Sequence, residues 1–196
     1  MKTILLDVDD VICISGYLDA INEFLGTNYE IDDFDSYYIE KDVLNEDQIE
    51  DFYKFVENRN FYKNPTFLPD AIETIKKLNE KYEIFICSAY VNYANKERAG
   101  RELTEKYNFL IESLPFLNSE NFIFASNKNM FKADIRIDDK KSNLKGEGEI
   151  KILFPAHHNL SFTDEYLDKY NIIRAGRDWR NGWKEIENIL LKQGAK

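Results

Sequence analysis

Short apolar runs that alternate with helical segments constrain the fold of this chain more than any other feature of its sequence. The runs lie at residues 3–8, 82–88, 121–125, 134–137, 150–154 and 172–175. Runs of this length between helical segments are typical of strands buried in a parallel sheet. We therefore predict an α/β fold with an open, mostly parallel, Rossmann-like sheet and helices on both faces. Ligands of such sheets bind beyond the carboxyl ends of the strands.

Apolar residues at helical spacing occupy much of the sequence between these runs. We predict helices near 18–25, after an N-cap at Asn45, from Pro69, over 92–107 and over 179–191. The first two fall between the first strand and the second. This placement predicts a small helical cap at 15–65, inserted into a core domain formed by 1–14 and 66–196.

The charge balance excludes some classes of partner. The 196 residues carry a formal net charge of −10 and show no basic stripe, which argues against binding of a nucleic-acid polymer. A small phosphorylated substrate stays possible if a metal ion and a few lysines offset the repulsion locally. The apolar run that ends at Asp7 is too short for a signal peptide or a membrane span, so we expect a cytoplasmic protein without a membrane partner. Oligomeric state is left open.

Polar side chains stand at the predicted strand ends or in the loops that follow them. They are Asp7 and Asp9, Ser88, Lys128, and the pair Asp138-Asp139. Asp7 can attack a phosphorus atom and form an aspartyl-phosphate, which splits a slow hydrolysis into two easier steps. Asp9 projects to the same side if the strand geometry persists, so it can act as the general acid and base. Ser88 and Lys128 can hold phosphate oxygens.

The attack of a carboxylate on a phosphate dianion requires positive charge nearby. Two unit charges 4 Å apart repel by about 4 kcal/mol at an effective dielectric of about 20. Mg²⁺ prefers oxygen ligands, and Asp7, one carboxylate of the later pair and a backbone carbonyl can supply them. We therefore predict Mg²⁺ as the cofactor.

These residues, in this order, resemble the four motifs of the haloacid dehalogenase superfamily of phosphatases. Further stretches are similar to the 5'(3')-deoxyribonucleotidase family: Asn60-Phe61-Tyr62-Lys63, Leu68-Pro69-Asp70-Ala71, Asn127-Lys128, Ile137-Asp138-Asp139-Lys140, Ile152-Leu153-Phe154, His158-Asn159 and Trp183-Lys184-Glu185-Ile186. The likeness spans roughly Ile4 to Ile186.

The resemblance implies a Mg²⁺-dependent phosphatase of nucleoside monophosphates, deoxyribonucleoside monophosphates above all. It implies Asp7 as the nucleophile and Asp9 as the acid and base. It also implies metal ligands from Asp7, Asp138 and the backbone carbonyl of Asp9, with the backbone of Val8 a further contact.

Phosphate and substrate contacts are implied in the same way. Ser88, Ala89 and Lys128 match the phosphate clamp, although Ala89-Tyr90 replaces a second hydroxyl and a Pro of well-known members. Phe61 and Tyr62 match an aromatic pair that surrounds the base.

Two departures near the first motif bear on substrate choice. Tyr17 is shifted from a position where some members carry a base-stacking aromatic residue. Asp10 stands where relatives often have Gly, and the roles of Asp10 and Asp139 are left open.

Other conspicuous residues have structural interpretations. We interpret Asp134 as a turn former, and Cys13 and Cys87 as reduced core residues. We place His157 and His158 in a loop or at a rim, and Trp179 with Trp183 in helix packing onto the sheet.

Three alternatives are kept. A phosphatase of another small metabolite would use the same residues. A phospho-accepting signalling module also needs an Asp, a Lys and Mg²⁺, but it places the Asp deeper in the chain and lacks an acid two residues beyond it. A catalytically silent binding protein could retain the fold, but no motif is missing.

Overall fold

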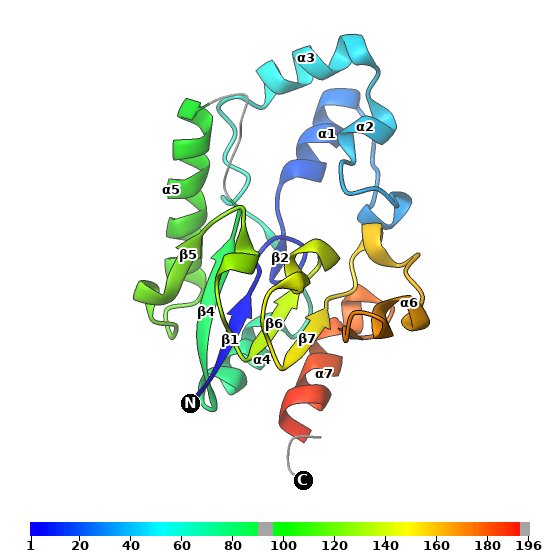
Figure 1. Ribbon diagram of the computed structural model, residues 1–196. Coiled ribbons are helices and arrows are strands. Elements are labelled where there is room, and N and C mark those ends of the chain that lie inside the picture. The colour runs from blue at the N-terminus through cyan, green and yellow to red at the C-terminus, as the bar shows by residue number, and fades with distance from the viewer. Residues whose placement is uncertain (90–95, 193–196) are drawn as a thin grey trace.

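The computed structural model describes residues 1–89 and 96–192 and shows a six-stranded sheet beneath a helical cap (Figure 1). Every pairing in the sheet is parallel, and the strand order is β5-β4-β1-β6-β7-β8. The strands are β1 (Lys2–Leu6), β4 (Tyr82–Ser88), β5 (Phe122–Phe124), β6 (Ile135–Asp138), β7 (Ile150–Leu153) and β8 (Ile173–Arg174). The predicted fold class is confirmed, and each strand lies within two residues of its predicted bounds.

Strand β1 occupies the middle of the sheet and positions the site. Ile4 and Leu6 of β1 are fully buried, as expected for a strand covered on both faces. The chain pairs β1 with β4 on one side and with β6 on the other. The order of the strands therefore reverses at β1, and the crevice beyond its carboxyl end is the place where sheets of this kind bind ligands.

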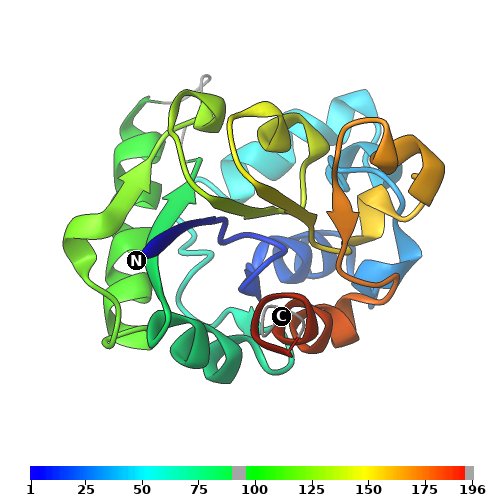
Figure 2. The same cartoon turned by 60° about the horizontal axis from the view of Figure 1, so that its bottom comes forward.

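Longer helices cover one face of the sheet. Helices α4 (Ala71–Asn79) and α7 (Gly182–Glu187) contact each other there, as Figure 2 shows. The opposite face carries the short 3-10 turns η3 (Lys128–Met130) and η4 (Lys141–Lys145), with α6 (Asp164–Asp168) near β8. Both faces are covered, as predicted, but unequally.

Helix boundaries differ from the predicted ones where side chains set the ends. Helix α5 (Lys96–Ser113) continues past the predicted end at 107 because buried Phe109 and Leu110 extend its apolar face. The start of that predicted helix, at 92–95, lies outside the described residues. The predicted helix at 179–191 divides into a 3-10 turn, η6 (Trp179–Asn181), then α7, then a π turn, η7 (Asn188–Lys192). The Asp178 side chain accepts a hydrogen bond from Arg180 N and so caps the start of η6.

The cap contains α1 (Tyr17–Leu25), η1 (Ile31–Asp33), α2 (Glu40–Val43) and α3 (Glu46–Phe55) and lies over the carboxyl ends of the strands (Figure 1). Asn45 caps α3 as predicted, since its Oδ1 accepts from Gln48 N at 2.9 Å and Gln48 Oε1 accepts from Asn45 N at 3.1 Å. The cap has a hydrophobic core of its own around fully buried Phe52.

A two-stranded antiparallel sheet joins the cap to the core. Strand β2 (Cys13–Ile14) pairs with β3 (Thr66–Phe67), so the segments that leave and re-enter the core lie side by side. Strands of two residues have no periodicity, and the sequence did not predict them. We propose that this pairing marks the boundary between the core domain and the cap.

Contacts at the edge of the core also hold the cap. The Asp32 carboxylate accepts from Trp179 Nε1 at 2.8 Å and from Arg180 at 2.6 Å. Trp183 is fully buried and donates from Nε1 to Val11 O at 2.7 Å. Both tryptophans pack against the core, as predicted: Trp183 is fully buried, and Trp179 is half-buried and also connects the core to the cap.

We expect Gly182→Ala to destabilise the protein. A Cβ at Gly182 would lie 2.6 Å from Cζ of the fully buried Phe154 ring. Overpacking of this kind costs about 1–3 kcal/mol. Gly100→Ala in α5 is the matched control, because a Cβ there meets nothing within 4 Å and Ala favours helices by about 1 kcal/mol over Gly. Urea unfolding checks both variants, and equal midpoints would contradict the packing argument.

Candidate active site

The side chains predicted to carry the chemistry converge beyond the carboxyl ends of β1, β4 and β6. Asp7 follows β1, Ser88 ends β4, Asp138 ends β6, and Lys128 lies on η3. All four are at most 7% exposed. Buried polar groups at one edge of a sheet, from segments far apart in the sequence, are typical of a functional site.

Lys128 lies between two carboxylates. Its Nζ is 2.6 Å from Asp7 Oδ1 and 2.8 Å from Asp138 Oδ2. Burial raises the pKa of Asp7 to about 6, the charge of Asp138 adds to the shift, and Lys128 opposes it. Burial lowers the pKa of Lys128, but the charges of Asp7 and Asp138 outweigh it and raise that pKa above its ordinary value. Lys128 therefore stays protonated and orients both carboxylates.

Asp9 receives a hydrogen bond on each carboxyl oxygen. Tyr62 Oη donates to Oδ1 at 2.5 Å, and Lys106 Nζ donates to Oδ2 at 2.6 Å. Burial raises the pKa of Asp9, but the charge and hydrogen bond of Lys106 and the hydrogen bond of Tyr62 outweigh it and hold that pKa below its ordinary value.

Lys106 is a site residue that the sequence analysis missed. It lies on α5, is 4% exposed, and also donates to Ser88 Oγ at 2.9 Å and to Ala89 O at 2.8 Å. The sequence of this helix is rich in charged residues, which predicted a helix exposed to solvent. One signal was available, since Lys106 precedes the buried residues Phe109 and Leu110 by three and four positions and therefore lies on their helix face.

The two acids of the Asp138-Asp139 pair differ in their hydrogen bonds. Both carboxylate oxygens of Asp138 accept hydrogen bonds. Oδ2 accepts from Lys128 Nζ, and Oδ1 accepts from Lys140 N at 2.9 Å and from Asn143 Nδ2 at 3.0 Å. Among the described residues, the Asp139 carboxylate accepts only on Oδ2, from His158 Nε2 at 2.7 Å. Asp139 Oδ1 therefore has no hydrogen-bond donor within the described parts of the chain.

The acidic cluster offers the ligands that a hard divalent cation prefers. Two overlapping groups have ligand atoms within 4.8 Å of one another: Asp7, Asp138 and Asp139, and Asp10, Asp139 and His158. No described residue donates to Asp7 Oδ2 or Asp139 Oδ1, so these oxygens can bind a cation without loss of a hydrogen bond. The donor set of buried carboxylate oxygens fits Mg²⁺.

Mutual repulsion in this cluster favours a cation. Burial raises the pKa of Asp139 well above its ordinary value, and the nearby Asp138 raises it further. Burial, with the charges of Asp9 and Asp7, raises the pKa of Asp10 to about 7. Asp10 also has a φ of 57°, a conformation that costs less for Gly than for most residues. A cation beside these acids would favour their ionised forms.

The two histidines lie in the loop between β7 and α6, in agreement with the predicted loop or rim position, but they are not exposed. They lie on η5 (His157–Asn159), where His157 is 7% exposed and its Nε2 contacts Ser36 O of the cap at 3.1 Å. Burial lowers the pKa of His158 to about 4, with His157 and Lys140 adding to the shift. A neutral His158 can donate from Nε2 to Asp139 and fix its carboxylate. Their turn packs against the cap, which the sequence alone does not show.

The cap aromatic residues named from the sequence divide into two groups. Phe61 is 5% exposed and packs with Tyr17 at a ring distance of 5.3 Å, and Tyr17 packs on Phe52 at 5.7 Å. Tyr17 and Phe61 thus belong to the core of the cap, and their contact with a substrate stays a prediction. Tyr62 instead reaches Asp9.

Tyr37 is a cap residue near the acids that the sequence analysis did not select. Its ring lies 3.2 Å from Lys140 Nζ and 5.2 Å from the ring of His158. Burial raises the pKa of Tyr37, and the charges of Asp139 and Asp9 add to the shift.

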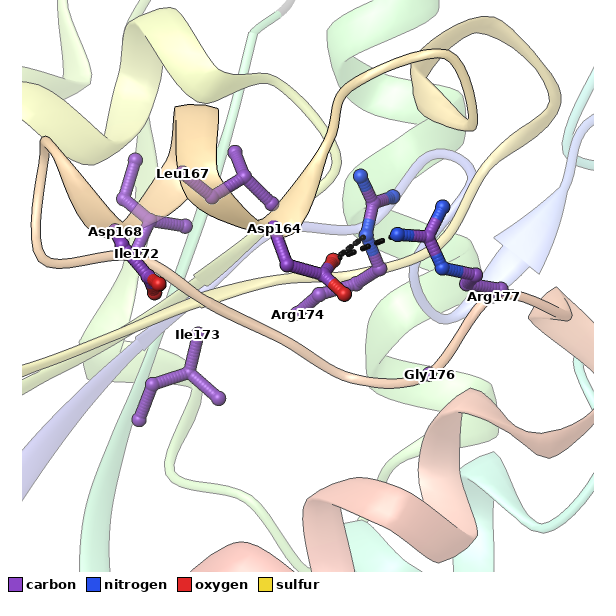
Figure 3. A pocket seen from close by; sticks show the side chains of 8 residues that line it. All are labelled: Asp164, Leu167, Asp168, Ile172, Ile173, Arg174, Gly176 and Arg177. Carbon is purple, nitrogen blue, oxygen red and sulfur yellow. Dashed lines mark hydrogen bonds and ion pairs between the residues drawn. The ribbon is translucent and has the colours of Figure 1, made fainter.

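A cavity of about 340 Å³ lies apart from these residues, between α6 and β8 (Figure 3). Arg174 and Arg177 line it, and both contact Asp164, at 3.5 Å and 2.9 Å. None of the residues predicted to carry the chemistry lines this cavity.

Comparison with known proteins gives one family. The family model described as 5' nucleotidase, deoxy (pyrimidine), cytosolic type C protein matches residues 1–192. The 5'(3')-deoxyribonucleotidase of Bacillus subtilis strain 168 is 28% identical over 201 residues, covering 97% of this chain and 99% of the relative. The enzyme of the same name from Bacillus phage SPbeta matches with the same identity and coverage.

Solved structures agree on the fold. A haloacid dehalogenase-like family hydrolase from Xanthomonas campestris has a TM-score of 0.52 at 10% identity and covers 100% of this chain and 99% of its own. The haloacid dehalogenase-like hydrolase YfnB from Bacillus subtilis, solved with magnesium bound, has a TM-score of 0.50 at 15% identity, with coverage of 96% and 98%. At these identities the likeness supports the fold alone.

Proposed function

The chain belongs to the 5' nucleotidase, deoxy (pyrimidine), cytosolic type C protein family, and from this premise we propose that it hydrolyses deoxyribonucleoside monophosphates with Mg²⁺ as cofactor. As a member of this family it is a phosphoric monoester hydrolase of the deoxyribonucleotidase type. The observation that carries the proposal is the buried contact of Asp7 with Lys128 directly beyond β1, with Asp9 held nearby by two donors.

The reaction proceeds in two steps. A carboxylate oxygen of Asp7 attacks the phosphorus and the bond from phosphorus to the nucleoside oxygen breaks. Because Lys106 and Tyr62 hold the pKa of Asp9 low, Asp9 must first take up a proton from solvent, and it then passes that proton to the leaving oxygen. Asp9 then takes a proton from the water that attacks the aspartyl-phosphate, which releases phosphate and restores Asp7. Lys128 and Val8 N hold Asp7 Oδ1, at 2.6 Å and 2.7 Å, and so fix the attacking carboxylate.

Two buried lysines offset charge as the phosphate enters. Lys128 lies beside Asp7, and Lys106 lies beside Asp9 and Ser88. Because an unscreened pair of like charges costs about 4 kcal/mol at 4 Å and a dielectric of about 20, both cations lower the barrier to approach. We assign the phosphate clamp to Ser88, Ala89 and Lys128, as the sequence predicted, together with Lys106.

The metal ligands are proposed as Asp7, Asp139 and the backbone carbonyl of Asp9. The sequence favoured Asp138, but its two oxygens already accept three hydrogen bonds, whereas Asp139 keeps Oδ1 open. A bound Mg²⁺ would supply positive charge beside the phosphate oxygens and the attacking carboxylate. Asp138 then serves to hold Lys128.

A nucleotide substrate is favoured by the family and by the cap above the strand ends. The related proteins from Bacillus subtilis and its phage are named for action on deoxyribonucleotides. Tyr37 of the cap segment contacts Lys140 and the ring of His158, next to the acidic cluster, and is 43% exposed. We propose Tyr37 as a contact for the nucleoside, alongside the contacts predicted for Tyr17 and Phe61, whereas the hydroxyl of Tyr62 is directed to Asp9.

Phosphate release from a panel of substrates tests this function. With Mg²⁺ present, deoxyribonucleoside 5'- and 3'-monophosphates should be hydrolysed with kcat/KM at least about tenfold above sugar phosphates, a difference of about 1.4 kcal/mol in transition-state binding. Ribonucleotides in the same panel report the sugar preference. If sugar phosphates equal or exceed every nucleotide, the phosphatase acts on another metabolite. A long-lived phosphoprotein without turnover would favour the signalling module instead.

Among the described residues, no helix combines the length and the apolar character needed to cross a membrane. The cytoplasmic location stays a prediction.

A further inference from the structure

Tyr62 lies where the core domain and the cap meet. It packs against the hydrophobic core of the sheet and against that of the cap. Its hydroxyl reaches across to Asp9, where Oη is 2.5 Å from Oδ1. A residue between α3 and β3 therefore touches the acid and base of the proposed reaction directly.

The position of the Tyr62 ring is fixed by several contacts. The ring stacks on Phe109 at 5.7 Å with an interplanar angle of 29°, and Lys106 Nζ lies 5.0 Å from its centroid. Asn60 Oδ1 accepts from Tyr62 N at 2.8 Å, which holds the backbone in a turn. The phenol is therefore presented to Asp9 in one orientation.

Asp9 needs such a contact because little else restrains its carboxyl group. Its side chain is 37% exposed, and Lys106 bonds only to Oδ2. Ser88 Oγ lies 3.5 Å from the same oxygen, a weak contact. Without Tyr62 the carboxyl group could rotate about its bond to Cβ, and Oδ1 would lose its fixed direction.

We propose that Tyr62 is a positioning residue that orients Asp9 for proton transfer and makes this orientation depend on the placement of the cap. This inference rests on the proposed function. Each carboxyl oxygen has two lone pairs, so Oδ1 can accept from Tyr62 and still carry the proton that Asp9 transfers. That proton moves from Asp9 to the leaving oxygen, and Tyr62 keeps its own.

The contacts distinguish this role from that of an aromatic residue around the base. The hydroxyl of Tyr62 is directed to Asp9, and its ring is covered by Phe109 and Lys106. A Phe at this position would keep the packing and lose the hydrogen bond. The chemistry of the hydroxyl can therefore be separated from the packing of the ring by one substitution.

The test compares two leaving groups in Tyr62→Phe. A nucleoside leaves as a strongly basic oxygen and needs a proton, whereas p-nitrophenol leaves readily without one. We expect kcat/KM to fall about 10- to 100-fold for a deoxyribonucleoside monophosphate and less than about threefold for p-nitrophenyl phosphate, since general acid catalysis contributes about 10²- to 10⁴-fold. Tyr53→Phe, a cap tyrosine 49% exposed, is the matched control and should leave both values unchanged.

A second comparison uses Asp9→Asn. If Tyr62 acts through Asp9, then Tyr62→Phe should add less than about twofold loss in the Asp9→Asn background, because the two changes remove one function. Equal loss on both leaving groups, full independent loss in the Asp9→Asn background, or no loss in Tyr62→Phe would each overturn the proposal. Failure of the proposed function would give a different result, since the unmodified protein with Mg²⁺ would then not hydrolyse the deoxyribonucleoside monophosphate, whatever its activity on p-nitrophenyl phosphate.

Discussion

Asp7→Asn is expected to lower phosphate release from deoxyribonucleoside monophosphates by at least about 10⁴-fold, as removal of a nucleophile does in other covalent enzymes. The amide is nearly the same size as the carboxylate but has lost the charged oxygen that attacks phosphorus. It also weakens one of the two carboxylate contacts of Lys128. Steady-state phosphate release with saturating Mg²⁺ measures the effect.

Two further measurements connect this loss to the nucleophile. Rapid quenching of the unmodified protein should trap a phosphoprotein that Asp7→Asn does not form. Asp134→Asn is the matched control, because Asp134 accepts from Thr3 N at 2.7 Å near the amino ends of the strands, far from the chemistry. If Asp7→Asn retained a turnover rate within about tenfold of that of the unmodified protein, the covalent mechanism would be excluded.

Asp139→Asn is expected to raise the Mg²⁺ concentration for half-maximal activity by about 100-fold or more. Loss of groups that merely support a metal ligand costs about 10- to 100-fold in affinity, and a direct ligand should cost at least as much. The expectation follows from Asp139 Oδ1, which receives no hydrogen bond from the described residues. Titration of activity with Mg²⁺ after treatment with EDTA measures it.

The substitution Asp138→Asn tests which of Asp138 and Asp139 is the metal ligand. Asp138 accepts from Lys128, Lys140 N and Asn143, so its substitution should lower the free energy of unfolding by about 1–3 kcal/mol. We expect its Mg²⁺ requirement to change less than about tenfold. The opposite pattern, with the large shift in Asp138→Asn, would restore the ligand favoured by the sequence. Activity that survives EDTA in the unmodified protein would exclude a metal requirement altogether.

Asp10 adds an acid to a cluster that already contains Asp7, Asp9, Asp138 and Asp139. Its carboxylate has no hydrogen-bond donor among the described residues, and its pKa is raised to about 7 by burial and by Asp9 and Asp7. Lys140 opposes this shift. The cluster therefore holds more negative charge than the buried lysines Lys106 and Lys128 neutralise, which is consistent with a divalent cation in the working enzyme.

Part of the site followed from the sequence because it depends only on where strands end. The carboxyl ends of parallel strands meet at one edge of a sheet, so side chains just beyond β1, β4 and β6 had to converge. Asp7, Ser88 and Asp138 could therefore be named from apolar runs that stop at polar residues. The prediction of a cap rests on similar reasoning, because helical segments interrupt the alternation after the first strand.

Other parts depended on how distant segments pack. Lys106 contacts Asp9 because α5 runs alongside β4 (Figure 1). Tyr62 contacts Asp9 because the chain returns there from the cap to the core. The difference between Asp138 and Asp139 arises from donors on η4, η5 and the backbone of Lys140. Periodicity sets which face a residue takes on its own element, but a hydrogen bond needs two elements at a fixed distance. The sequence by itself thus determined the fold class and the edge of the sheet where the candidate site residues meet, and the tertiary structure decided which oxygens there receive no hydrogen bond from the described residues.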